Sequence, residues 1–184
     1  MTSKSMEIII FQVQRYTIPV STGLVNSIDL SMINHPVKTI FFGLEGLTRP
    51  RSDDNGKTFT FSDAELQLNG TTVFDKMSPM YFHVVQSFYH TDNAVINWKQ
   101  YSQASQPFYT LLYMYNFCLN SSSYRPTGTC NFSRLDNAKI ILNNVISCNF
   151  VQSAQVPITT GVVYAVSYNV LKIQNGLGGI LFGN

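Results

Sequence analysis

The feature that most constrains the fold is a long alternation of residue types near the C-terminal end of the chain. Five β-branched or aromatic residues stand at every second position: Val162, Tyr164, Val166, Tyr168 and Val170. Residues two apart lie on the same face of a β-strand, and such side chains pack well on a pleated surface. The segment 162–171 therefore predicts the longest clean strand of the chain and favours a β-rich fold.

Shorter runs of the same kind bring the expected number of strands to about eight. The others cover 8–20, 27–34, 37–44, 64–68, 71–74, 109–116 and 138–142. Within 27–34, the alternation places Ile28, Leu30 and Met32 on one face of a half-buried strand. Asn69-Gly70 joins two of the runs, and this dipeptide predicts a type I′ hairpin.

One helix interrupts the strands. Ser78-Pro79 predicts its start, because Pro is favoured at the first helical position. Apolar residues then follow at helical spacing: Tyr81, Val84, Val85 and Phe88. The pattern predicts one short helix near residues 78–90. About eight strands with one short helix indicate an all-β fold, an eight-stranded antiparallel double-sheet jelly roll, which is a form of β-sandwich.

Length and composition restrict the function classes. At 184 residues the chain fits one all-β domain with a sizeable core. Charged residues make up 12% of the chain, about half the usual share, while aromatic residues reach 13%, so much of the surface should be covered by something. A formal net charge of +2 is too small to indicate direct nucleic-acid binding.

The cysteines and the hydropathy indicate the compartment. Cys118, Cys130 and Cys148 cannot all pair within the chain and lack the C-x-x-C spacing of a metal clip, which favours a reducing compartment. No apolar run approaches the ~20 residues that span a bilayer, so we expect no transmembrane segment. The first residues are too polar to begin a secretory signal, and we expect an unexported chain. The sequons at Asn69, Asn120 and Asn131 are interpreted as turn asparagines.

The sequence predicts no catalytic, cofactor-binding or metal site. A G-x-S-x-G nucleophile elbow does not occur. The pairing of a cysteine with His35, His83 or His90 remains open but is outweighed by ordinary buried thiols and imidazoles. The three histidines also lack the H-x-H pair of cupin metal sites. The segment 51–56 has no closing Glu for a calcium loop, and 175–179 lacks the Lys of a phosphate-binding loop.

A structured corner is expected at residues 124–138, between an aromatic strand and an apolar strand. Gly and Pro break the strand pattern there, and Asn and Asp can bond their own backbone. Arg134 is singled out, because a guanidinium between Ser133 and Asp136 can form several hydrogen bonds at once. Two roles remain open for Arg134, an internal staple of the corner, which is slightly favoured, and a contact between neighbouring subunits.

This corner resembles the P-S-G-x-x-N-x-S-R-x-D-N signature of the major capsid proteins of nucleocytoplasmic large DNA viruses. The structural or assembly motif consists of Pro126, Gly128, Asn131, Phe132, Ser133, Arg134, Asp136 and Asn137. Other matches follow the family's order: His35-Pro36-Val37-Lys38, Leu66-Gln67-Leu68-Asn69-Gly70, Met80-Tyr81-Phe82, Tyr113 to Leu119, and 163–173 followed by Gly176 and Gly179. The resemblance covers roughly residues 24–184.

Members of this family carry two jelly rolls in tandem, and the matching motifs belong to the second. The resemblance implies that residues 23–184 form the second jelly-roll domain of a double jelly-roll capsid protein. Residues 1–22 would be an N-terminal arm or linker able to supply a first strand. It also implies a structural protein rather than an enzyme, in homotrimers that form pseudo-hexagonal capsomers and tile an icosahedral shell.

The implied partners are other copies of the chain, neighbouring capsomers, the first jelly-roll domain of the same protein and minor capsid proteins. The implied location is the capsid shell of the virion, assembled in the host cell cytoplasm. Two alternatives remain. A jelly-roll carbohydrate-binding module would stack sugars on Trp98, Tyr101 or Tyr109, and a cupin-like metal enzyme would require a bound metal.

Overall fold

The computed structural model describes residues 5–19, 25–44, 57–92, 112–149 and 160–183. The strands are β1 (Ser5–Pro19), β2 (Val25–Asp29), β3 (Pro36–Leu44), β4 (Lys57–Thr60), β5 (Asp63–Leu68), β6 (Thr71–Met77), β7 (Leu112–Asn116), β8 (Cys130–Asn131), β9 (Ala138–Asn143), β10 (Ile146–Asn149), β11 (Thr160–Gln174) and β12 (Leu177–Ile180). The helical segments are the π-helical turn η1 (Tyr81–Val85), α1 (Gln86–His90) and the 3-10 turn η2 (Phe132–Arg134).

The strands form two main antiparallel sheets. In the described residues their orders are β1-β11-β3-β7 and β2-β9-β5-β6. Along the chain, the eight strands of these two orders alternate between the two sheets, except that β5 and β6 form a hairpin within one sheet. This alternation is the connectivity of a jelly roll, so the all-β, eight-stranded double-sheet prediction is confirmed. Short strands add to it, with β8 on β3, β12 on β11, and a separate β4–β10 pair.

The hydrophobic core lies between the sheets. Along β5 and β9, buried residues alternate with more exposed ones, and Ala64, Leu66, Ile140 and Leu142 are almost fully buried. An aromatic cluster fills one end, where the ring of Phe42 lies 5.4 Å from Phe82 and 5.8 Å from Tyr113 between ring centroids. The period-two pattern read in the sequence therefore places one face of each of these strands in the core.

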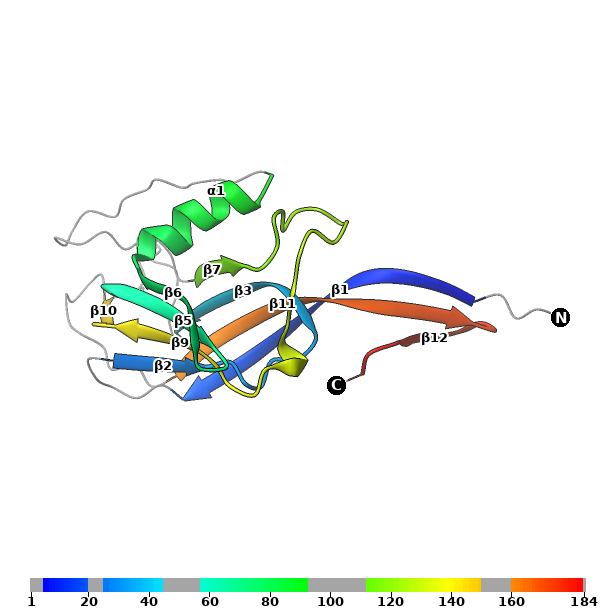
Figure 1. Ribbon diagram of the computed structural model, residues 1–184, viewed down its shortest axis with the longest axis horizontal. Helices are drawn as coiled ribbons and strands as arrows, with labels where there is room; N and C mark the ends of the chain where they lie inside the picture. The colour runs from blue at the N-terminus through cyan, green and yellow to red at the C-terminus, as the bar shows by residue number, and fades with distance from the viewer. Residues whose placement is uncertain (1–4, 20–24, 45–56, 93–111, 150–159, 184) are drawn as a thin grey trace.

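The helix and the hairpin lie where the sequence places them. Helical backbone continues through η1 and α1 and ends at His90, and in Figure 1 this helix lies beside β7. Asn69 and Gly70 have φ angles of 49° and 76°, the positive values that a type I′ turn requires at both central positions. Both predictions are confirmed.

The predicted strand over 27–34 is wrong at its C-terminal end. β2 ends at Asp29, whose Oδ1 accepts a hydrogen bond from the Ser31 backbone N–H at 2.9 Å. This side chain starts a turn, and Met32 becomes 60% exposed instead of sharing the buried face of Ile28 and Leu30. Of the predicted strand 109–116, residues 109–111 lie outside the described part of the chain, and the rest forms β7.

Candidate functional site

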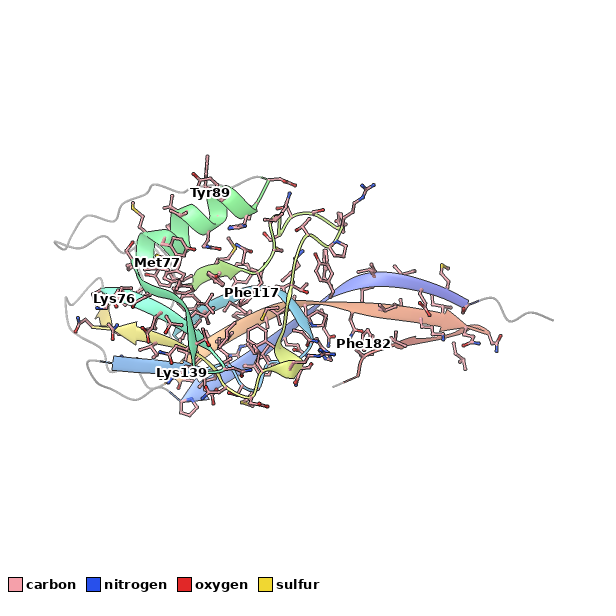
Figure 2. All side chains as sticks on the ribbon, in the orientation of Figure 1. Lys76, Met77, Tyr89, Phe117, Lys139 and Phe182 are labelled. Carbon is pink, nitrogen blue, oxygen red and sulfur yellow. The ribbon has the colours of Figure 1, made fainter. Side chains whose placement is uncertain are left out.

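The corner of residues 124–138 is ordered by a buried ring and a side-chain cap. Phe132 in η2 is 2% exposed, and its ring centroid lies 5.5 Å from that of Phe117. Phe117 follows β7 and is labelled in Figure 2. The Asn131 side-chain Oδ1 accepts a hydrogen bond from the Ser133 N–H at 3.1 Å. The aromatic contact thus fixes the corner against the end of β7, and Asn131 caps its helical turn.

Ser133 connects the corner to the β2–β3 connection. Its Oγ accepts a hydrogen bond from the backbone N–H of His35 at 2.8 Å, and the His35 carbonyl accepts one from the Phe132 N–H at 3.1 Å. His35 has a φ of 72°, an uncommon backbone conformation for a residue with a side chain. These two hydrogen bonds hold the peptide of His35 in that conformation, directly before β3 begins.

Asn69 connects the corner to the β5–β6 hairpin. Its Oδ1 accepts hydrogen bonds from the backbone N–H groups of Asp136 at 3.0 Å and Asn137 at 3.2 Å. Its own N–H donates to the Asn137 carbonyl at 2.6 Å. Three chain connections far apart in sequence are therefore joined at the corner, directly before β9 enters its sheet.

Among the described residues, Arg134 makes no side-chain contribution to the hydrogen bonds of the corner. Its side chain is exposed, and in the part of the chain that the structure describes it forms no hydrogen bond or ion pair. Polar side chains of other residues, Ser133 and Asn69, make the internal connections instead. The favoured interpretation of Arg134 as an internal staple has no support among the described residues, and its role as a contact between subunits stays a prediction. Pro126 and Gly128 are also exposed.

We expect Ser133→Ala to lower the free energy of unfolding by about 1–2 kcal/mol, because the His35 N–H would lose its acceptor. Arg134→Ala should change the same quantity by less than about 0.5 kcal/mol, because the side chain is exposed and has no bonded partner among the described residues. Urea denaturation of both variants measures the difference. A larger loss for Arg134→Ala than for Ser133→Ala would contradict this assignment of the two roles.

Gly128 stands where a side chain does not fit. Its φ is +147°, and a Cβ built on it would lie 2.8 Å from the carbonyl oxygen of Phe117. We expect Gly128→Ala to destabilise the fold by more than about 1 kcal/mol, because the Phe117 carbonyl oxygen and the Cys118 Cα, 3.1 Å from such a Cβ, would have to move. Gly179→Ala is the matched control, since nothing lies within 4 Å of a Cβ at that position. Equal denaturation midpoints for the two variants would contradict the prediction.

A buried lysine lies where β1 and β11 leave the sandwich. Lys38 of β3 is 3% exposed, and its Nζ lies 3.7 Å from the ring centroid of Phe11 and 5.4 Å from that of Tyr168. Tyr124 stacks on Phe11 with 5.8 Å between ring centroids. Burial lowers the pKa of Lys38, an effect that the nearby Cys118 partly offsets, and burial raises the pKa of Tyr168. Cation–π attraction is expected to hold the three strands together.

The histidines and cysteines are scattered over the described structure. His35 is buried at the corner, burial lowers the pKa of His83, and His90 Nδ1 lies 3.2 Å from the Leu119 carbonyl oxygen. Cys118 and Cys130 are free thiols. Within the described ranges, no three His, Cys, Asp or Glu side chains are grouped so that they could hold a metal ion.

Several sequence predictions fall outside the described residues. They concern the side chain of Cys148, the calcium-like segment 51–56, and the three rings considered for sugar stacking, Trp98, Tyr101 and Tyr109. Among the helices of the described segments, none is long and apolar enough to cross a membrane.

Sequence reasoning identified the corner but missed two of its connections and the lysine cluster. The sequence indicates Asn69 as a turn residue and part of a family motif, and His35 as part of a motif and a candidate partner of a cysteine, but neither as a connection to the corner. A signal for Lys38 was present, because it is the one charged residue in the mostly apolar strand β3. Its aromatic partners come from strands far away in sequence, so no local pattern could reveal them.

Comparison with known proteins decides the family. Residues 1–179 match the family model described as the large eukaryotic DNA virus major capsid protein. The chain belongs to this family. It is 32% identical over 170 residues to the major capsid protein of Pyramimonas orientalis virus, covering 82% of this chain and 37% of that protein. It is 31% identical over 152 residues to the major capsid protein of Paramecium bursaria Chlorella virus 1, covering 71% of this chain and 32% of that protein.

The solved structures agree with the jelly-roll architecture. A chain of the PBCV-1 virus capsid aligns with a TM-score of 0.71 at 24% identity, over 98% of this chain and 52% of that one. The Faustovirus major capsid protein aligns with a TM-score of 0.55 at 14% identity, over 91% of this chain and 33% of that one. The chain thus spans about a third of these curated relatives and about half of the PBCV-1 chain.

Proposed function

We propose that this capsid-family chain serves as a structural building block of a viral shell and catalyses no reaction. The observation that carries the proposal is the family match over residues 1–179, on a chain whose strand order is that of a jelly roll. The corner supports it, because its polar groups are used in backbone hydrogen bonds that hold connections together. Such an arrangement gives a rigid block, as repeated assembly requires.

We further propose that residues 23–184, joined by the first strand β1 from residues 1–22, act as the second jelly roll of a double jelly-roll capsid protein. Homotrimers of the whole protein would form pseudo-hexagonal capsomers, which tile an icosahedral shell together with neighbouring capsomers and minor capsid proteins. The virion shell is then the place of function, and the host cytoplasm the place of assembly. The partial coverage of the relatives supports a further domain in the complete protein.

Purified virions test the proposal. Peptides of this chain should be among the most abundant in shells washed with detergent and nuclease, because a major shell protein is present in many copies. An intact-mass measurement of the same material gives the size of the complete viral product, which should exceed the 20.7 kDa of this chain. Absence of these peptides from washed shells would refute the capsid function.

A further inference from the structure

Three strands continue beyond the two-sheet body as an arm. We define the arm as residues 5–12 of β1, 167–174 of β11, and β12. The pairing of β11 with β3 ends at Ser167, whereas its pairing with β1 continues to Gln174 opposite Ser5. Figure 1 shows this part of β1 and β11, with β12 alongside, projecting away from the stacked sheets. Within the described residues the arm therefore has no second sheet across from it.

One face of the arm is apolar like a core. Residues opposite each other in antiparallel strands share a face, so the core residues Ile18 and Val163 identify which face points inward. The same side of the sheet continues along the arm toward its tip, where it carries only apolar side chains. We call this surface the inner face; it consists of Met6, Ile8, Ile10, Leu171, Ile173 and Ile180. Met6 is 54%, Ile8 42% and Ile180 48% exposed.

A polar belt separates the inner face from the core. Between them, the same face carries Gln12, Gln14, Ser167 and Asn169. Asn169 is 1% exposed, and its Nδ2 donates to Gln12 Oε1 at 2.9 Å and to the Phe182 carbonyl at 2.8 Å. Phe182, labelled in Figure 2, lies beside β11 at this point. The inner face is thus a separate apolar surface and not an exposed margin of the core.

The arm is held as a folded element. Asn175 and Gly176 have φ angles of 53° and 79°, which closes the β11–β12 hairpin with a tight turn. On the opposite, outer face, Lys172 Nζ and Glu7 Oε1 lie 3.9 Å apart as an ion pair. The Lys38 ammonium group lies over the ring of Phe11 on the same face. The outer face is therefore interrupted by charge, whereas the inner face is uninterrupted.

We propose that the inner face of the arm docks on a neighbouring copy of this chain and is the contact through which copies associate. An apolar sheet face without a second sheet packed on it requires another apolar surface to exclude water. The proposal rests on the proposed function, because a shell built from many copies supplies that surface repeatedly. The charges on the arm pair with each other, so they favour no charged partner.

The available area also favours repeated copies. From strand rise and spacing, the inner face covers roughly 350 Å². A standard interface buries about 800 Å² on each partner, so one arm contact alone is about half of what stable association needs. In a closed ring each copy gives one arm and receives one. Two contacts per copy then approach the standard area.

Lysine substitutions on the two faces of the arm test the contact in the 184-residue chain. The inner-face variant carries Ile8→Lys and Ile180→Lys. The matched control carries Ile9→Lys and Leu177→Lys, which lie on the outer face of the arm in the same two strands and are 55% and 78% exposed. In sedimentation, the unmodified chain and the control should self-associate, and the inner-face variant should associate at least tenfold more weakly. Circular dichroism checks the fold of each variant. If the inner-face lysine variant melts at a lower temperature than the unmodified chain, a variant with Ile8→Thr and Ile180→Thr takes its place.

A cross-linking experiment identifies the occupant. A photoreactive amino acid replaces Ile180 in a mixture of isotopically light and heavy chains, and the expected products join a light to a heavy peptide. A monomeric unmodified chain, equal weakening by the control, or cross-links confined to one chain would overturn the inference. The virion analysis is independent of this test. If the chain is found in shells but its inner-face variant associates normally, only the arm contact is refuted. If the chain is absent from shells, only the capsid function is refuted.

Discussion

Replacing Phe42 by alanine should lower the free energy of unfolding by about 3–5 kcal/mol, the usual cost of removing a buried aromatic ring. Phe42 is fully buried in β3, the strand between β11 and β7. Its ring centroid lies 5.4 Å from Phe82, 5.8 Å from Tyr113 and 6.5 Å from Phe61. The substitution would leave a cavity between side chains from three separate segments, and they cannot all move in to fill it.

Phe88→Ala is the control for this prediction. Phe88 lies on α1 and is 62% exposed, so the same chemical change should alter the free energy of unfolding by less than about 1 kcal/mol. Chemical denaturation followed by intrinsic fluorescence measures both variants. Similar midpoints for Phe42→Ala and Phe88→Ala would show that the aromatic cluster does not stabilise the sandwich.

Replacing Gln86 by alanine should cost about 2–3 kcal/mol, because several buried polar groups would lose their partner. Gln86 is 3% exposed. Its Oε1 accepts hydrogen bonds from the backbone N–H of Asn116 at 2.9 Å and from Asn116 Nδ2 at 3.3 Å, and its Nε2 donates to the Tyr81 hydroxyl at 2.8 Å. Asn116 Oδ1 in turn accepts from Thr39 Oγ1 at 2.7 Å. This network joins the helix to β7 and β3.

Gln67→Ala provides the comparison. The half-buried Gln67 side chain donates to Glu65 Oε1 of its own strand at 2.6 Å, so its loss leaves no buried backbone group without a partner. We expect a change of about 0.5 kcal/mol or less in the free energy of unfolding. If thermal and urea denaturation give Gln86→Ala the same small effect, the buried network contributes specificity of packing rather than stability.

The local predictions succeeded where one short pattern carries all the information. Asn69-Gly70 gives its turn because both residues accept positive φ at small cost, and Ser78-Pro79 precedes a helix because Pro suits a helix start. The prediction for 27–34 failed where two local signals compete. The alternation of Ile28, Leu30 and Met32 favours a longer strand, but the Asp29 side chain bonds the Ser31 N–H and ends it.

At the corner, the sequence favours Arg134 as the residue that joins the chain segments, whereas the described hydrogen bonds between those segments come from other side chains. Arg134 has the greatest hydrogen-bonding capacity of the segment, yet it is exposed and unbonded among the described residues. Asn69 and His35 reach the corner instead, from 67 and 98 positions away in sequence. Spacing within a motif cannot show which distant backbone groups will be brought beside it.

The sequence by itself determined the class of fold and the family, because alternation and turn residues act over a few positions and are written in the chain directly. The core-facing side of β1 and β11 continues into the arm, from Ile18 to Met6 and from Val163 to Ile173, and carries apolar residues at both ends. Only the tertiary structure decided which of these apolar residues are covered. Burial depends on where the second sheet ends, and that is fixed by the packing of strands distant in sequence, not by the strand that carries the pattern.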